Sequence, residues 1–182
     1  MNCSRLAAAI ALAAACTAVL AQPKSDWEIQ QETRDWKESE VPMPAYPRPE
    51  NLIEFEDVSN TSFRFFVDGQ SLIAGSDGAI RYTLVARSRS GVENVSFNGL
   101  RCKTSAHKVY AIGRADKTWV LTANGEWREL QKKPSVRPHM VLMHDFFCPS
   151  GVPIMSKDEG IQALRQGIHP YAVSYQPGMG KR

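Results

Sequence analysis

The residues with the clearest chemical potential are His139, His144 and Asp145, the one cluster of histidine and carboxylate side chains in the sequence. Imidazole and carboxylate groups serve as metal ligands and as general acids or bases. The five-residue spacing of the histidines argues against a shared site, because it sends the rings to opposite faces of a strand and separates them by about 140° on a helix. We therefore predict no catalytic and no metal-binding residue, and keep a hydrolase or metal-dependent enzyme using His144 and Asp145 as the alternative hypothesis.

The sequence lacks the short motifs of the common catalytic chemistries. It contains no Gly-x-Ser-x-Gly, no His-Glu-x-x-His, no glycine-rich phosphate loop and no Cys-x-x-Cys pair. This absence argues against an enzyme without excluding a site that is assembled from scattered positions. No cofactor is predicted. His107 and His169 stand alone in the sequence and are expected at the surface or in capping roles.

The N-terminus has the pattern of a secretory signal. Arg5 precedes an almost entirely aliphatic stretch, residues 6–20, and small residues stand before the expected cleavage point after Ala21. The stretch is short of the roughly 20 residues that span a bilayer, so we predict no transmembrane span in the mature chain. A lipid-anchored envelope lipoprotein, with Cys16 as the modified residue, is the alternative. The predicted location is the periplasm.

Removal of the signal leaves two of the four cysteines, Cys102 and Cys148. Two cysteines in an exported chain most simply form a disulfide. Two separate buried thiols are the alternative, and a redox pair is disfavoured because reactive dithiols usually have Cys-x-x-Cys spacing.

Charge is unevenly distributed along the chain. Between residues 79 and 120 eight basic residues face two acidic ones, a net charge of +6, whereas residues 22–60 carry ten acidic and four basic residues, a net charge of −6. The net charge of +3 for all 182 residues therefore hides a strong internal separation. The candidate anion-binding surface consists of Arg81, Arg87, Arg101 and Lys103.

Three kinds of partner suit the basic region. Aromatic residues interleave with it, as in nucleic-acid readers, but an exported protein rarely works on nucleic acid, so nucleic acid is not predicted as a partner. Anionic components of the cell envelope are a more reasonable external partner. The third hypothesis is internal: the acidic arm, anchored through Trp27 and Trp36, folds back over the basic sheet.

The elements that position these residues are mainly strands. Residues 79–102 predict two antiparallel strands joined by a polar turn at 87–91. Alternation in the first strand predicts a buried face of Ile80, Tyr82, Leu84 and Ala86, and a solvent-facing side of Arg81, Thr83 and Arg87 that only Val85 interrupts. In the second strand Val95 and Phe97 are expected to share the core of that buried face.

Turn residues divide the remaining segments. A strand at 62–67 is expected to end at the Asp68-Gly69 turn, and a short strand at 71–74 to follow it. Strands at 107–112 and 117–121 flank a turn at 113–116. Because the connections are too short for helical crossovers, these segments predict a twisted, mostly antiparallel sheet of about six or seven strands.

The ends of the chain have a different character. Prolines between residues 42 and 49 predict an extended arm, and apolar residues between 140 and 147 predict a strand or helical turn that carries Cys148. Ser156 and Glu159 form a capping box for a short helix that ends near Gly167. The fold class is α+β, divided into a signal (1–21), an acidic proline-rich arm (22–50), a single domain (51–169) and a flexible tail (170–182).

Several runs resemble the cryptic neisserial protein-like family of exported bacterial proteins, over roughly residues 35–164. The most specific are residues 81–88, RYTLVARS, and residues 93–97, ENVSF; 62–68, 101–103 and 147–149 add to them. The resemblance implies an exported chain whose two mature cysteines pair. It supplies no substrate, ligand or catalytic residue.

The sequence thus leaves the molecular function unknown and leans away from an enzyme. The favoured hypothesis is a non-enzymatic binding or interaction module of the periplasm or cell envelope, with an envelope component or another protein as its unidentified partner.

Overall fold

The computed structural model describes residues 34–56, 62–123, 125–130 and 137–172. The predicted signal, Cys16, Trp27 and most of the predicted tail lie outside these residues. The chain divides into one unit of residues 1–35 and a second of residues 36–182, and the description below concerns the second. In the described part of the chain no helix is long and apolar enough to cross a bilayer.

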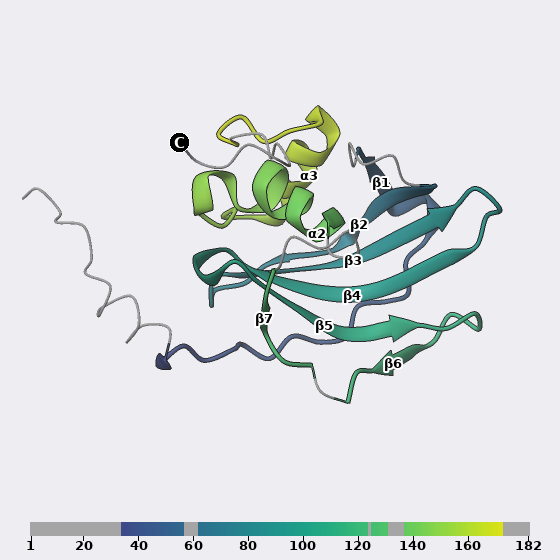
Figure 1. Ribbon diagram of the computed structural model, residues 1–182, viewed down its shortest axis with the longest axis horizontal. Helices are drawn as coiled ribbons and strands as arrows, with labels where there is room; N and C mark the ends of the chain where they lie inside the picture. The colour runs from purple at the N-terminus through teal and green to yellow at the C-terminus, as the bar shows by residue number, and fades with distance from the viewer. Residues whose placement is uncertain (1–33, 57–61, 124, 131–136, 173–182) are drawn as a thin grey trace, which may run out of the picture. The chain divides into compact units, whose positions relative to one another are not determined.

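One antiparallel sheet organises the second unit (Figure 1). Six strands follow one another in sequence order across it, and a seventh short strand pairs with β5 beside β6. The strands are β1 (Leu52–Phe55), β2 (Phe63–Ala74), β3 (Ala79–Ser88), β4 (Glu93–Arg101), β5 (Ala106–Gly113), β6 (Trp119–Leu121) and β7 (Arg128–Glu129). All the strand pairs in the described residues are antiparallel, so the predicted sheet of about six or seven mostly antiparallel strands is confirmed there.

The prediction of a turn at Asp68-Gly69 is wrong. Strand β2 runs through both residues, and the register shifts between Asp68 and Ile73. The polar residues stabilise this irregularity locally, because Asp68 Oδ1 accepts a hydrogen bond from the Gln70 amide at 3.0 Å and Ser71 Oγ donates to the Asp68 carbonyl at 2.8 Å. These turn-forming contacts thus produce a bulge in a continuous strand.

The β3–β4 hairpin is confirmed, but its faces differ from the prediction. Val95 pairs with Val85 and Phe97 pairs with Thr83, so these two residues of β4 lie on the opposite face from Tyr82. Arg81 and Thr83 have no exposed surface, although alternation predicts a wet side for them. Strand β3 is buried on both faces because helices cover one and the N-terminal segment covers the other.

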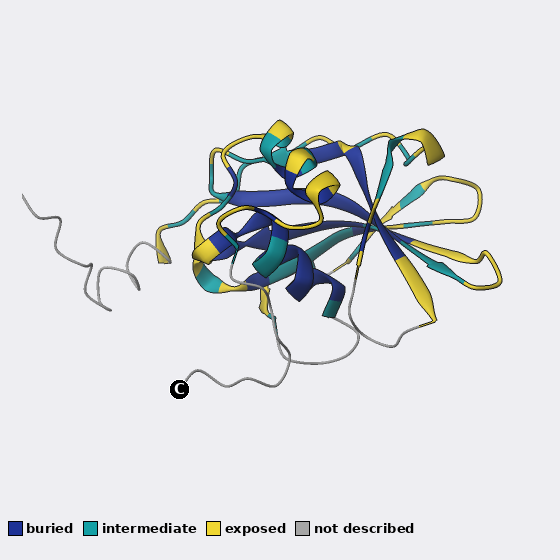
Figure 2. Cartoon of the chain, turned by 90° about the horizontal axis from the view of Figure 1, so that it is seen from above, coloured by how far each residue is buried: buried dark blue, intermediate teal, exposed yellow. Residues whose placement is uncertain are grey.

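The helical elements lie together over one face of the sheet (Figure 1). They are α2 (Arg137–Val141), a wider π-helical segment (Leu142–Phe147) and α3 (Lys157–Gln166). Leu142 and Phe147 are fully buried against Tyr82 and Leu100 in the main hydrophobic core. Buried residues accordingly fill the middle of the strands and the helices above them, whereas the outer hairpin ends are exposed (Figure 2).

Helix α3 begins and ends where the sequence predicts. Ser156 Oγ accepts a hydrogen bond from the Glu159 amide at 3.1 Å, and the Glu159 carboxylate accepts one from the Met155 amide at 2.7 Å. Gly167 ends the helix in the left-handed conformation, with φ of 82°. Both ends thus satisfy backbone groups that the helix itself leaves free.

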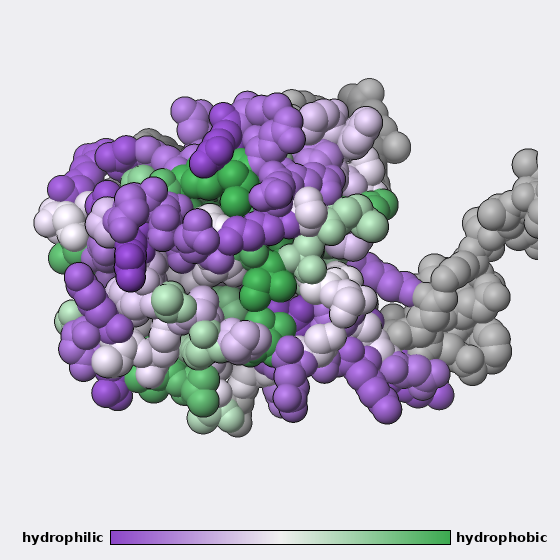
Figure 3. Space-filling view, turned by 180° about the vertical axis from the view of Figure 1, so that it is seen from behind, coloured by the Kyte–Doolittle hydropathy of each residue, from purple (hydrophilic) through white to green (hydrophobic). Residues whose placement is uncertain are grey.

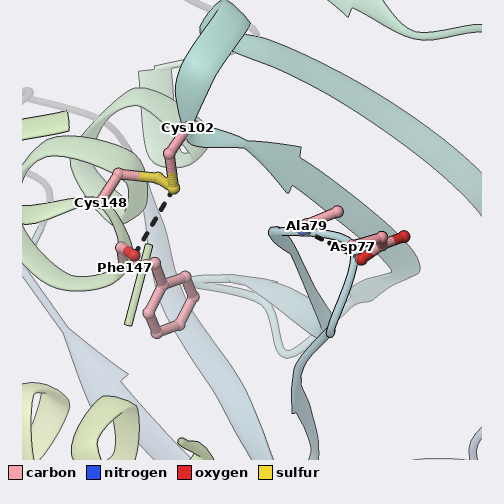
Figure 4. Close-up of a disulfide and its surroundings, with 5 residues drawn as sticks. All are labelled: Asp77, Ala79, Cys102, Phe147 and Cys148. Carbon is pink, nitrogen blue, oxygen red and sulfur yellow. Dashed lines mark hydrogen bonds between the residues drawn. A yellow bond between two sulfur atoms is a disulfide. The ribbon is translucent and has the colours of Figure 1, made fainter. Parts of the chain in front are cut away.

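The disulfide between Cys102 and Cys148 is confirmed (Figure 4). Cys102 follows the last residue of β4, and Cys148 follows the π-helical segment, so the bond ties the sheet to the helical layer. Both cysteines are buried, and Cys102 Sγ lies 3.8 Å from the Phe147 carbonyl oxygen.

Removing this bond with Cys102→Ala/Cys148→Ala is expected to lower the free energy of unfolding by about 4 kcal/mol, because the sequence separation is 46 residues. Urea unfolding of the variant and of the oxidised and reduced wild-type protein measures this loss. An unchanged unfolding midpoint in the variant would contradict it.

Candidate functional site

The N-terminal segment of the second unit covers the face of the sheet opposite the helices. We call residues 36–46 the strap. Its proline-rich part is extended, and Trp119 Nε1 donates a hydrogen bond to the Pro44 carbonyl at 3.0 Å. Tyr46 packs on the Trp119 ring, with centroids 5.3 Å apart, and its hydroxyl donates to the Arg114 carbonyl at 3.2 Å. The described part of the acidic arm therefore contacts the basic sheet.

The carboxylate of Glu38 lies among donors from the sheet. Tyr110 Oη donates to Glu38 Oε1 at 2.5 Å and Lys108 Nζ to Oε2 at 2.7 Å. Trp127 Nε1 also donates to Oε2, at 3.1 Å, and an Arg81 nitrogen lies 3.7 Å from Oε1. Four side chains thus bind one carboxylate, in charge-assisted contacts that are stronger than neutral hydrogen bonds.

Trp36 occupies the neighbouring position on the sheet. The Arg101 guanidinium lies over its ring, 4.1 Å from the centroid, and Trp127 contacts it edge to face at 5.6 Å. Trp36 Nε1 donates a hydrogen bond of 2.7 Å to the Asp77 carbonyl. The sheet therefore recognises both the aromatic ring and the carboxylate of the strap. We call the receiving residues the cradle: Arg81, Arg101, Lys108, Tyr110 and Trp127.

The cradle residue Arg81 also forms a buried ion pair with Asp77. Arg81 donates to both carboxylate oxygens of Asp77, at 2.8 Å and 2.6 Å, and the side chains are 0% and 3% exposed. Asp77 also accepts a hydrogen bond from the Ser39 amide at 2.9 Å, so it holds the strap as well. Strand β3 thus presents Arg81 to two carboxylates, Asp77 and Glu38.

The acids of this network remain charged at neutral pH. Burial alone would raise the pKa of Asp77, but hydrogen bonds from Arg81 and from the Ser39 amide outweigh it and lower the pKa to about 2. Burial also opposes the ionisation of Glu38, whose pKa is nevertheless lowered by hydrogen bonds from Lys108 and Tyr110. Burial, together with the Glu38 carboxylate, raises the pKa of Tyr110, so that its hydroxyl stays a donor.

A glycine makes room for the aromatic part of the cradle. A Cβ atom at Gly99 on β4 would lie 2.7 Å from the Trp127 ring and 2.9 Å from the Tyr110 hydroxyl. Tyr110 and Trp127 therefore lie directly over the backbone of β4, and a side chain at this position would displace them.

The four basic residues predicted as an anion-binding surface do not form one surface. Arg81 and Arg101 belong to the cradle, where they contact the strap. Arg87 pairs with Glu93 at 2.7 Å and lies over the Phe66 ring. Lys103 is exposed in the turn after β4. In the view from behind, hydrophobic side chains lie in patches among hydrophilic ones (Figure 3).

Sequence reasoning missed Lys108, Tyr110 and Trp127 as partners of Glu38. The signal for the first two is their spacing, because residues two apart on a strand share a face. Trp127 gives no comparable signal, since it lies before the two-residue strand β7 and reaches the cradle through tertiary packing.

Two of the histidines stack on each other, His139 from α2 and His107 from β5. His139 is buried and its Nδ1 lies 2.6 Å from Tyr82 Oη, and the His107 ring stacks on the His139 ring with centroids 3.9 Å apart. His107 is half-buried against this ring rather than free at the surface, which is one of the two roles predicted for it. Burial lowers the pKa of His107 to about 4, and burial together with neighbouring His107 holds the pKa of His139 well below its usual range. Both rings are neutral at pH 7.

His144 and Asp145 lie on the π-helical segment and are half-buried. Burial lowers the pKa of His144, against the opposing charge of Asp145. The Asp145 carbonyl accepts a hydrogen bond from the His169 amide at 2.8 Å. His169 is itself buried beside Glu159 rather than at the surface, one of the two roles predicted for it. Among the described residues no group of three or more histidine, cysteine or acidic side chains is arranged to hold a metal ion.

Comparison with known proteins identifies the family. The sequence model of the CNP1-like family matches residues 31–165, which include the strap and the whole cradle. The chain belongs to the CNP1-like family. It is also 25% identical, over 163 residues, to Cryptic neisserial protein 1 of Neisseria gonorrhoeae (strain ATCC 700825 / FA 1090), an alignment that covers 79% of this chain and 78% of that protein. No solved structure matches the chain. The resemblance seen in the sequence is thus confirmed.

The stacked histidine pair predicts that acid destabilises this CNP1-like protein. A histidine whose folded pKa is depressed binds more protons when unfolded, so the free energy of unfolding falls as the pH drops from about 6.5 towards 4. The expected slope is up to about 1.4 kcal/mol per pH unit for each histidine. Urea unfolding at pH 7.5 and pH 5 measures it. His107→Gln removes one titrating group and should reduce the slope; identical slopes in the variant and the wild type would contradict the assignment.

Proposed function

We propose that the protein is an exported, non-enzymatic binding module of the cell envelope whose cradle recognises acidic aromatic peptide segments of the form Trp-x-Glu. The observation that carries the proposal is the position of Glu38, whose carboxylate is bound by Lys108, Tyr110 and Trp127 next to a tryptophan that lies on Arg101. The strap is the resident ligand of this site, and an external segment of the same chemistry is its competitor.

The contacts of the strap favour exchange. Within the described residues, no backbone-to-backbone hydrogen bond joins residues 36–46 to the sheet, and the strap is held through side chains. Its removal would therefore leave the strand ladder intact. The side chains of Glu38 and Lys108 are also partly exposed, at 25% and 17%, so the cradle lies at the surface.

The strap has the advantage of being tethered. A short tether gives an effective concentration of the order of millimolar, so an external peptide of equal intrinsic affinity binds only weakly while the strap is in place. An external partner must therefore make more contacts with the protein than the strap does. The strap thus blocks the cradle. Binding of an external peptide is expected to improve when the side chains of Trp36 and Glu38 are removed.

The test uses full-length chains that differ only in the strap. Trp36→Ala/Glu38→Ala empties the cradle, and a fluorescein-labelled peptide with the sequence of residues 34–42, RDWKESEVP, serves as the probe. We expect fluorescence anisotropy to show binding to this variant, at least tenfold weaker binding to the wild type, and weakening by salt because the contacts are charged.

Matched peptides and a further variant make this result specific. Peptides carrying Glu38→Gln or Trp36→Ala should bind less well, and Lys108→Ala added to the emptied chain should remove most of the affinity. Circular dichroism establishes that each variant is folded. If the probe fails to bind a folded, emptied chain, or binds it equally well without Lys108, the cradle is no recognition site.

Export is supported by the signal pattern in the sequence and by the buried disulfide, which persists in oxidising compartments. Intact mass spectrometry of protein purified from the envelope should give a chain that begins at Gln22. Cys102 and Cys148 should resist alkylation until reduced. A lipid-carrying chain that begins at Cys16 would indicate the membrane-anchored alternative, and an unprocessed N-terminus would contradict export by a cleaved signal.

A further inference from the structure

A pocket lies between the proline-rich end of the strap and the irregular part of β2. It has a volume of about 480 Å³ and is lined on one side by Pro42, Pro44 and Tyr46. Asp68 and Ser71 of β2 line the other side. The pocket is distinct from the cradle, since no cradle residue lines it.

Asp68 is an unusual residue for such a position. It is 3% exposed, and its described contacts do not include an ion pair. Burial raises its pKa, although hydrogen bonds from the Gln70 amide and from Ser71 and the charge of Lys157 act in the opposite direction. Lys157 itself donates its hydrogen bonds to Gln70. A buried carboxylate without a direct ion pair is unfavourable, so a cation in the pocket would stabilise its charged form.

A second polar group on the same face, the Thr83 hydroxyl, has no hydrogen-bond partner among the described residues. Thr83 pairs with Asp68 across the β2–β3 ladder, so both side chains project from the same face. Thr83 Oγ1 is buried and has no hydrogen-bond partner among the described residues. A carboxylate without an ion pair and an unpaired hydroxyl thus lie on one face of neighbouring strands.

A second pocket adjoins the first and indicates which kind of molecule would bring a cation to Asp68. It has a volume of about 370 Å³ and shares Glu50, Asn51 and Gln70 with the first pocket. Its lining includes Leu52, Ile53 and Glu54 of β1, and Ile161 and Arg165 of α3. Consecutive strand residues point to opposite faces, so a pocket lined by all three follows the edge of the strand.

The edge of β1 is available for pairing. β1 pairs with β2 alone among the described strands, and the one other described backbone hydrogen bond of residues 52–55 is that of the Leu52 amide, which donates to the Pro49 carbonyl. An exposed strand edge presents N–H and C=O groups that only another extended main chain can satisfy in register. A free amine would fill the first pocket but leave these groups unpaired.

We infer that the two adjoining pockets form one groove that binds an extended peptide segment, with a lysine or arginine side chain against Asp68 and the peptide main chain along β1. The charged residues that line the two pockets are three acids, Glu50, Glu54 and Asp68, and two bases, Arg48 and Arg165, so the excess of negative charge is small but favours a basic segment. The carboxylates disfavour a nucleic acid or another polyanion. This groove and the cradle are separate surfaces, so either assignment can fail without the other.

The experiment follows the amide resonances of the ¹⁵N-labelled mature chain during titration with the blocked peptide Ac-Thr-Val-Lys-Val-Thr-Val-NH₂. We expect shift changes at residues 50–54 and 68–71. The same peptide with norleucine in place of lysine should bind at least tenfold more weakly. Asp68→Asn keeps the shape and the acceptor for Gln70, and should abolish the preference for lysine over norleucine.

Three controls make the inference falsifiable. Asp158→Asn alters an exposed aspartate that lines neither pocket and should leave binding unchanged. n-Butylamine that reproduces the affinity of the lysine peptide would overturn the strand-edge part. A peptide methylated on alternate backbone nitrogens should bind at least tenfold more weakly than the unmethylated peptide. Equal binding of the two peptides would also overturn the strand-edge part. Absence of shift changes at millimolar peptide, or an unchanged lysine preference in folded Asp68→Asn, would overturn the Asp68 site.

Discussion

The ion pair between Arg81 and Asp77 is the constraint on which the second face of the sheet depends. Both side chains are buried, and neither charge would be stable there alone. Arg81 satisfies Asp77 through two hydrogen bonds, and Asp77 in turn accepts the Ser39 amide. The strap completes the arrangement, because it excludes water from charges that would otherwise be solvated. Burial of the pair and docking of the strap therefore stabilise each other.

The two faces of the sheet are built on different principles. The helical face is an apolar core with one disulfide, in which Tyr82, Leu100 and Phe147 pack by shape. The strap face has a smaller hydrophobic cluster of Phe66, Val85 and Val95, flanked by charged and aromatic residues. Apolar packing tolerates many side chains of similar volume, whereas a carboxylate surrounded by four donors requires particular atoms at particular places. Specificity is thus concentrated on the strap face.

Local signals in the sequence predict much of the fold. The hairpin, the number of strands and both ends of α3 follow from alternation, turn residues and capping residues, which act over a few positions. The cysteine count predicts the disulfide. The faces of the hairpin are mispredicted because alternation reports which residues share a side, not what covers that side. Arg81 has the pattern of a wet residue, and only tertiary structure shows that a distant segment buries it.

The candidate site is predictable only in part, for a related reason. Counting charges identifies Arg81 and Arg101 but does not separate them from Arg87, which pairs with Glu93 on the neighbouring strand. The partners of Glu38 come from β5 and from the residue before β7, and sequence distance hides their proximity. Because Glu38 is 70 residues away from Lys108 along the chain, its role depends on the path of the strap across the sheet.

The strap shapes two surfaces at once. Trp36 and Glu38 fill the cradle, and eight residues further along Tyr46 lines the pocket beside Asp68. Prolines between these points keep the segment extended and restrict its backbone, which lowers the conformational entropy that docking removes. Anchoring at the cradle therefore helps to position the wall of the pocket. The cradle and the pocket thus share one continuous stretch of backbone, although different residues line each of them.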